Sequence, residues 1–180
     1  VIGCELGQFF SRMGTQITIV EMADTIMSYE DESVTKQLLR QFKREKIKVL
    51  TASSVKDVEV QESGAVVTLS SGKTLDAEMV LLSIGRASFS KGLNLEALGI
   101  KVDSKGQIEV DESLETSVKG IYAVGDLINI PYLAHVASKE GIIAAENMLG
   151  KNKTAVHKAI PRCVYTDPQI AAVGLTEKEA

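Results

Sequence analysis

The sequence has few cysteines and no long apolar run, and each absence removes a class of protein. The longest apolar stretches, such as 79–84 and 121–124, fall far short of the roughly 20 residues that a membrane-spanning helix needs. Cys4 and Cys163 are far apart and belong to no C-x-x-C pair, so the chain is no disulfide scaffold and carries no dithiol centre of its own. We expect both thiols to be buried and unreactive, in a cytoplasmic compartment or, in a eukaryote, the mitochondrial matrix.

A strong charge of one sign is also missing. The 20 basic and 24 acidic residues give a net charge of −4 and are interspersed, so we expect neither a nucleic acid nor a membrane as partner. We predict no metal site either. Apolar residues make up 44% of the chain and charged residues 24%, which is typical of a folded globular protein. Internal repeats and low-complexity tracts are absent.

The first half of the chain alternates helical and strand patterns. We expect a helix over 3–13, a strand over 16–21, a helix from Asp31 to about residue 46, and a strand over 47–50. From residue 54 the pattern changes to period two with glycine turns, which predicts an antiparallel meander. Residues 79–84 form a continuous apolar run, which favours a strand buried on both faces of a parallel sheet.

The second half predicts a change of domain near residue 87. Strands are expected near 108–110 and over 121–124, and a long helical pattern over 134–149 is closed by Gly150. A basic linker over 151–158 leads to two further expected strands, 162–166 and 170–173, which begin a third unit.

Gly3 is the first candidate site residue. If a strand and two more glycines preceded it, Gly3 would complete a G-x-G-x-x-G motif, and the following helix would direct its N-terminus at a pyrophosphate. Glu21 then stands where a carboxylate can bind the adenosine ribose and repel a 2′-phosphate, which favours NAD over NADP. Simpler interpretations stay open: a glycine near a helix start is common, Glu21 could be a solvated carboxylate, and Glu5 could only stabilise the helix dipole.

Two more strand ends could carry chemistry. Gly85 follows the apolar run and permits a close approach of backbone to a flat ligand, although a simple turn is an equal alternative. Asp126 ends another expected strand, and its carboxylate could bind a sugar-like polyol. The helix after Leu133 would offer its free N–H groups to an electron-rich carbonyl or anion. Without a partner carboxylate in the pattern, His135 and His157 are expected to be partly exposed side chains.

Five segments together resemble the pyridine nucleotide-disulfide oxidoreductases in order and spacing: Gly3-Cys4-Glu5-Leu6-Gly7, Ile19-Val20-Glu21, Ser83-Ile84-Gly85-Arg86, Tyr122-Ala123-Val124-Gly125-Asp126 and Leu133-Ala134-His135. Within that family, 133–141 and 161–169 look most like the dihydrolipoamide dehydrogenase branch. The segment 86–89 departs from the family, which usually has a proline and an asparagine after the arginine.

The resemblance implies an α/β fold in three parts: a Rossmann-like NAD-binding domain over 1–87 with a parallel sheet and a meander, part of the FAD-binding domain over 88–155, and the start of an α+β dimerisation domain over 156–180. Its implied cofactors are FAD and NAD. Glu5 would have a supporting catalytic role beside the nicotinamide and flavin. Carried over, the NAD-binding residues are Gly3, Glu5, Glu21, Val55, Ser83, Ile84, Gly85 and Arg86, and the FAD-binding residues are Asp126, Leu133, Ala134 and His135.

The implied function is oxidation of protein-bound dihydrolipoamide with NAD⁺, through FAD and a redox disulfide, by a homodimer. Its partner would be the lipoyl domain of a 2-oxoacid dehydrogenase or glycine cleavage complex. The chain would be an internal fragment, because the cysteine pair and a His-Glu pair are not in it. Alternatives are a non-catalytic nucleotide-binding or assembly module, or another family member such as a soluble transhydrogenase, a mercuric reductase or a glutathione-type reductase.

Overall fold

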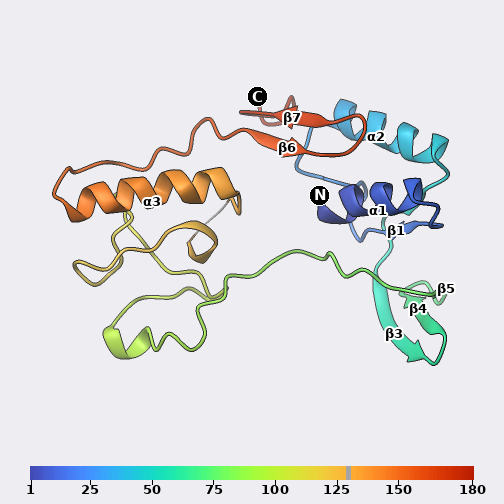
Figure 1. The fold of residues 1–180 in the computed structure, drawn as a ribbon, viewed down its shortest axis with the longest axis horizontal. Coiled ribbons are helices and arrows are strands. Elements are labelled where there is room, and N and C mark those ends of the chain that lie inside the picture. Colours follow the sequence, from blue (N-terminus) through green and yellow to red (C-terminus); the bar gives the residue numbers. More distant parts are fainter. Residues whose placement is uncertain (129–130) are drawn as a thin grey trace. The chain divides into compact units, whose positions relative to one another are not determined.

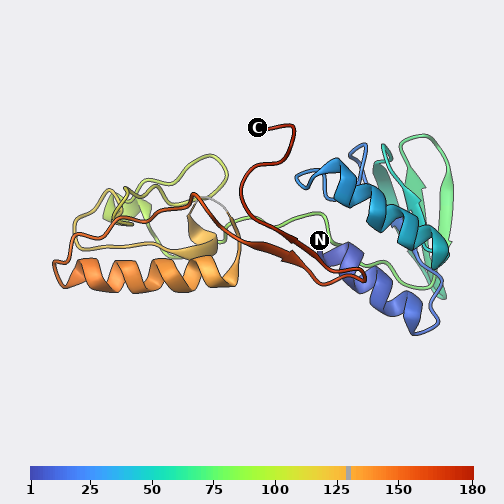
Figure 2. The same cartoon turned by 90° about the horizontal axis from the view of Figure 1, so that it is seen from above.

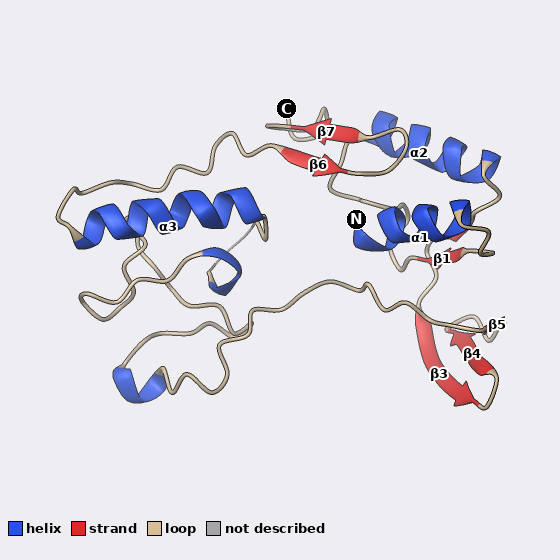
Figure 3. Cartoon of the chain, viewed as in Figure 1, coloured by secondary structure: helices blue, strands red, loops and turns tan. Residues whose placement is uncertain are grey.

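The computed structural model describes residues 1–128 and 131–180, which form two compact units. Unit 1 comprises Val1–Ile84 together with Pro161–Ala180, and unit 2 comprises Gly85–Ile160. Figure 1 follows the chain through both units, and Figure 3 separates helices from strands. Unit 2 is therefore inserted, in sequence, into unit 1.

Unit 1 begins with two helices and a pair of parallel strands. Helix α1 covers Ile2–Arg12 and helix α2 covers Glu32–Arg44, while β1 (Thr18–Val20) pairs in parallel with β2 (Lys48–Leu50). Asp31 caps α2, because its carboxylate accepts a hydrogen bond from the Ser33 N–H at 3.0 Å. These helix–strand alternations are those of an α/β fold.

An antiparallel meander follows β2. Strands β3 (Val55–Gln61), β4 (Gly64–Leu69) and β5 (Thr74–Ala77) lie in that order, and the register shifts between Val55 and Asp57. The β3–β4 turn requires glycine at position 64, whose φ of 138° is unsuited to an L side chain. The meander and the parallel pair confirm the predicted mixture of parallel and antiparallel sheet.

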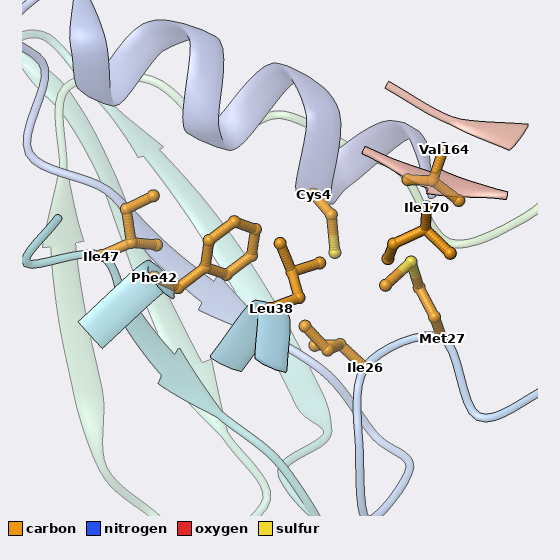
Figure 4. Packing of buried hydrophobic residues seen from close by; sticks show 8 residues of the cluster. All are labelled: Cys4, Ile26, Met27, Leu38, Phe42, Ile47, Val164 and Ile170. Atoms are coloured by element: carbon orange, nitrogen blue, oxygen red, sulfur yellow. The ribbon is translucent and has the colours of Figure 1, made fainter. Parts of the chain in front are cut away.

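The core of unit 1 joins the two ends of the chain. Its buried members, labelled in Figure 4, come from α1, the loop before α2, α2 itself, the residue before β2 and the C-terminal hairpin: Cys4, Ile26, Met27, Leu38, Phe42, Ile47, Val164 and Ile170. The hairpin consists of β6 (Arg162–Val164) and β7 (Ile170–Ala172). Burial of its apolar side chains against α2 and α1 accounts for its place in unit 1.

Polar contacts hold the same hairpin. The Arg162 guanidinium binds the buried Glu30 carboxylate through two nitrogens, at 3.0 and 3.3 Å, and Glu30 raises the pKa of Arg162. Gln8 of α1 donates to the Asp167 carbonyl oxygen at 2.8 Å and accepts from the Asp167 N–H at 2.7 Å. Two independent sets of bonds therefore tie residues 162–167 to the rest of unit 1.

Unit 2 consists mostly of loops around one long helix, as the view in Figure 2 also shows. Helix α3 covers Ala134–Met148, and the 3₁₀ turns η1 and η2 cover Glu96–Leu98 and Gly125–Leu127. Its buried core residues are Ile100, Ile108, Leu114, Ala123, Ile128, Ile143 and Ala144. None of the helices within 1–128 and 131–180 is long and apolar enough to cross a membrane.

Most expected elements are confirmed, but the prediction for 79–84 is wrong. This segment has no strand pairing, and its apolar side chains are exposed, Ile84 to 87%. A buried strand needs neighbours on both edges, and the parallel sheet of the described residues has only β1 and β2. The expected strands at 108–110 and 121–124 likewise form only isolated bridges. Cys4 is buried as expected, whereas Cys163 is exposed on the short hairpin.

Candidate nucleotide-binding sites

The start of α1 lies against the end of the apolar segment 79–84. A Cβ on Gly3 would lie 3.4 Å from the Ser83 Cβ, so the backbone of α1 approaches Ser83 closely. Farther along the helix, Gly7 is buried, and a Cβ there would lie 3.5 Å from the side chains of Ile17 and Ile19. Two glycines thus set α1 close to both Ser83 and β1, and the structure brings Gly3 and Ser83 together as predicted site residues.

Glu21 follows the last residue of β1. Its backbone N–H donates to the Leu50 carbonyl at 2.9 Å, which extends the pairing with β2 by one residue. Its carboxylate accepts a hydrogen bond from the Ala23 N–H at 2.8 Å and is partly exposed. The local bond fixes the side chain at the carboxyl end of the strand, which is the edge where open α/β sheets bind ligands.

Glu5 has a structural contact that the sequence pattern did not predict. Its carboxylate accepts a hydrogen bond from the backbone N–H of Tyr165, at 2.7 Å, in the loop between β6 and β7. The neighbouring Cys4 thiol is buried, and burial raises its pKa. Glu5 therefore helps to hold the C-terminal hairpin, whatever else it contacts when a ligand is bound.

The remaining predicted NAD residues are exposed. Val55, the first residue of β3, is 47% exposed, and Ser83 and Ile84 are exposed at the end of the unpaired apolar segment. Gly85 has a φ of 116°, and no atom lies within 4 Å of the position where its Cβ would be. Arg86 and Gly85 belong to unit 2, whereas the other predicted NAD residues belong to unit 1.

Asp126 lies in a polar cluster of unit 2. The Arg86 guanidinium contacts the Asp126 carboxylate at 2.8 Å, and the two side chains are about half exposed, 51% and 49%. Arg86 also donates to the Tyr132 carbonyl at 2.6 Å and lies over its ring, 5.3 Å from the centroid. Ser88 donates to the Asp126 carbonyl at 2.6 Å. Two residues assigned from the sequence to different nucleotides, Arg86 and Asp126, are therefore direct partners.

The turn that carries Asp126 requires glycine. Gly125 has a φ of 69°, and a Cβ there would lie 3.0 Å from the Ala137 Cβ on α3. Leu133 is the N-cap of α3, with extended backbone and no side-chain cap bond, and Ala134 and His135 are exposed in the first turn. This turn and the start of α3 meet in one region, which brings the predicted FAD residues together.

Glu140 is a functional candidate that the sequence reasoning missed. Its side chain is only 3% exposed, yet its carboxylate accepts from the Gly125 N–H at 2.7 Å and contacts His157 Nε2, also at 2.7 Å. His157 is partly exposed as expected, at 40%, but it has a carboxylate partner that the sequence pattern did not reveal. The contact spans 17 residues and could not be read from local spacing.

No group of three or more metal-ligating side chains occurs in the part of the chain that the structure describes. The candidate sites instead contain carboxylates close to glycines and to helix N-termini, with Asp126 also paired with Arg86. Such a set can accept hydrogen bonds from sugar hydroxyls and donate backbone N–H groups to anionic or electron-rich oxygens.

Comparison with known proteins identifies relatives along the whole chain. A dihydrolipoyl dehydrogenase of Thermus scotoductus is 39% identical over 184 residues, which cover 99% of this chain and 40% of that protein. A mitochondrial dihydrolipoyl dehydrogenase of Arabidopsis thaliana is 36% identical, over 99% of this chain and 36% of its own length. The chain thus spans about two fifths of the length of these relatives.

The fold has a close counterpart among solved structures. The crystal structure of LpdA from Mycobacterium tuberculosis matches with a TM-score of 0.92 and 29% identity, covering 98% of this chain and 39% of that one. The predicted α/β fold is therefore confirmed. The family model for pyridine nucleotide-disulphide oxidoreductases matches residues 1–141.

The family resemblance drawn from the five segments is confirmed, and the expected cofactors, FAD and NAD, are those that this family uses. The match includes the α1, β1 and Asp126 regions described above. The chain belongs to the pyridine nucleotide-disulphide oxidoreductase family.

Proposed function

We propose that this chain is the nucleotide-binding part of a dihydrolipoyl dehydrogenase, a flavoprotein that oxidises protein-bound dihydrolipoamide with NAD⁺. The names of the relatives, which match over 99% of the chain, support this substrate. The observation that carries the proposal is the half-exposed Asp126 carboxylate, on a glycine turn beside the N-terminus of α3, whose N-cap Leu133 makes no side-chain cap bond. No observation favours the transhydrogenase, the other reductases or a non-catalytic module.

The residues near Asp126 fit a flavin nucleotide. A side chain at Gly125 is disfavoured by the φ of 69° and by the Ala137 Cβ at 3.0 Å, so the turn presents backbone and one carboxylate, which suits the hydroxyls of the FAD ribitol. The first turn of α3, with Leu133, Ala134 and His135, would lie at the electron-rich edge of the flavin ring, where the helix N-terminus favours negative charge. The Leu133 N–H itself donates to the Pro131 carbonyl oxygen at 2.9 Å, so the backbone contact is assigned to the Ala134 N–H. Bound FAD would supply the transfer of electrons between the thiol substrate and the pyridine nucleotide.

The residues of unit 1 fit NAD in a similar way. Gly3 lets the N-terminus of α1 come close to the pyrophosphate, and Glu21 at the end of β1 accepts hydrogen bonds from the adenosine ribose. Val55 contacts the adenine side, Ser83, Ile84, Gly85 and Arg86 flank the dinucleotide, and Glu5 has a supporting role at the nicotinamide. Binding through Glu5 has to coexist with its hydrogen bond to the Tyr165 N–H.

We propose that the parent protein is a homodimer that serves the lipoyl domain of a 2-oxoacid dehydrogenase or glycine cleavage complex, in the bacterial cytoplasm or the mitochondrial matrix. Its NAD-binding domain would cover 1–87, its FAD-binding part 88–155 and the start of its dimerisation domain 156–180. The chain contains no closely spaced cysteine pair. The proposed reaction also uses a redox disulfide, which these 180 residues do not supply.

The decisive experiment uses the full-length parent enzyme and the variant Asp126→Asn. The amide still accepts hydrogen bonds but loses the charge that strengthens them, so we expect the FAD dissociation constant to rise about tenfold. Apoenzyme titrated with FAD and followed by flavin fluorescence measures it. Asp103→Asn is a matched control, because this carboxylate binds only backbone N–H groups of its own turn, at 105 and 107. Equal FAD affinity in wild type and Asp126→Asn would refute the assignment.

The substrate assignment has its own test. We expect the parent enzyme to reduce NAD⁺ with dihydrolipoamide and to be inactive with glutathione disulfide or mercuric ion in the reverse direction. In Glu21→Arg we expect the preference for NADH over NADPH to fall by at least tenfold, because a carboxylate that repels a 2′-phosphate is replaced by a cation that binds it. An unchanged preference would remove Glu21 from the NAD site.

A further inference from the structure

The pair formed by Glu140 and His157 is absent from every role assigned above. Glu140 lies on the buried side of α3, and a carboxylate in such a place is costly unless each oxygen has a partner. Both oxygens do: Oε2 accepts from the Gly125 N–H at 2.7 Å, and Oε1 contacts His157 Nε2 at 2.7 Å. Both bonds lie within unit 2.

The bond to Gly125 falls next to the residue that the proposed function makes central. Gly125 immediately precedes Asp126, and its left-handed φ of 69° sets the direction in which the chain enters η2. The same turn is limited by Ala137, one helical turn before Glu140, because a Cβ on Gly125 would lie 3.0 Å from the Ala137 Cβ. Helix α3 therefore fixes the turn in two ways, by close approach and by a charged acceptor.

His157 completes the arrangement from the segment after α3. Its side chain is 40% exposed, and its Nε2 contacts the buried Glu140 carboxylate. A donor at Oε1 restricts rotation of the Glu140 carboxylate and so keeps Oε2 directed at Gly125. Neither side chain contacts the Asp126 carboxylate, which binds Arg86 instead.

We propose that Glu140 and His157 are positioning residues for FAD: Glu140 holds the Gly125 N–H, His157 orients Glu140, and together they set the position of the Asp126 carboxylate. This inference rests on the proposed function, because it assigns to the pair an effect on the ribitol site. If the inference is right, substitutions of Glu140 or His157 weaken FAD binding because they displace the Asp126 carboxylate.

The test is a double-mutant cycle in the full-length enzyme, with FAD affinity as the measurement. Removal of a charged hydrogen-bond acceptor in Glu140→Ala is expected to raise the FAD dissociation constant roughly tenfold or more, and Glu140→Gln, which keeps a carbonyl acceptor, by roughly threefold or less. His157→Ala should also raise the FAD dissociation constant, by less than Glu140→Ala does. Glu146→Gln is the control, since this carboxylate of the same helix is paired at the surface with Lys151.

The cycle distinguishes positioning from general loss of structure. If Glu140 acts through Asp126, Glu140→Ala combined with Asp126→Asn should bind FAD about as weakly as the weaker of the two single variants. Multiplied effects would instead overturn the inference, as would FAD affinity in Glu140→Ala equal to that of Glu146→Gln. If Asp126→Asn alone leaves FAD affinity unchanged, the proposed function fails first and the inference falls with it. Should Glu140→Ala not fold, the conservative Glu140→Gln and His157→Ala carry the same cycle.

Discussion

Replacing Gly125 by alanine tests how strictly the Asp126 turn is defined. At a φ of 69° an L residue costs about 1–2 kcal/mol. The added Cβ, at 3.0 Å from the Ala137 Cβ, requires α3 or the turn to shift, at a cost of about 1 kcal/mol. The Gly125→Ala variant would therefore carry about 2–3 kcal/mol of strain if its turn kept the native conformation.

This strain should appear in flavin binding. Without FAD the turn can relax, so binding must restore the strained form, and we expect the FAD dissociation constant of Gly125→Ala to rise about 30- to 150-fold. The assay is titration of the full-length apoenzyme with FAD, followed by flavin fluorescence. Adding Ala137→Gly removes the close contact and should recover about fivefold, while the part due to φ remains.

A matched variant separates backbone strain from its location. Gly120 has a φ of 83°, and no atom lies within 4 Å of its Cβ position. Gly120→Ala should therefore lower stability without changing FAD affinity. If Gly125→Ala binds FAD within twofold of wild type, the turn does not hold the cofactor, and the reasoning fails.

Three further predictions concern unit 1 and its hairpin. Phe42→Ala removes a fully buried ring and should lower the free energy of unfolding by about 3–5 kcal/mol in urea denaturation, whereas Phe89→Ala, at an exposed ring, should change it little. Hydrogen bonds from Ser33 lower the pKa of Asp31, so its contribution to stability is present above the unfolded pKa of about 4 and is lost as pH falls through the lower folded pKa. The difference in free energy of unfolding between wild type and Asp31→Ala should therefore shrink in that acidic range. A difference that stays constant with pH would contradict this prediction. Arg162→Met leaves the buried Glu30 carboxylate without its cation and should make residues 162–172 exchange amide hydrogens faster, an effect that Glu30→Gln combined with Arg162→Met should partly reverse.

The helices and the meander could be predicted from the sequence because the signals that specify them lie within a few neighbouring residues. The 3.6-residue spacing of Val34, Leu38 and Phe42, the cap at Asp31 and the period-two pattern before and after Gly64 each act within a few residues. The run 79–84 was misassigned for the opposite reason. Its composition suits a buried strand, but burial depends on partners elsewhere, and the described residues provide none.

The candidate sites divide in the same way. Gly3, Glu21 and Asp126 could be chosen as candidate site residues from the sequence, because each lies at an expected strand end or helix start and the spacing between these points is local information. The pairing of Arg86 with Asp126 and of Glu140 with His157 could not, because these contacts join residues 40 and 17 positions apart. A mid-helix glutamate and a histidine in a basic linker give no local signal. Only the three-dimensional structure brings them together.

The C-terminal hairpin has a consequence for the order of events during synthesis. Gln8 bonds to Asp167 across 159 positions, and Cys4 shares a core with Val164 and Ile170. As the polypeptide emerges from a ribosome, helices α1 and α2 must wait until residues 162–172 have been translated before this part of their apolar surface is covered. Unit 2, whose residues are translated between those two stretches, can fold first.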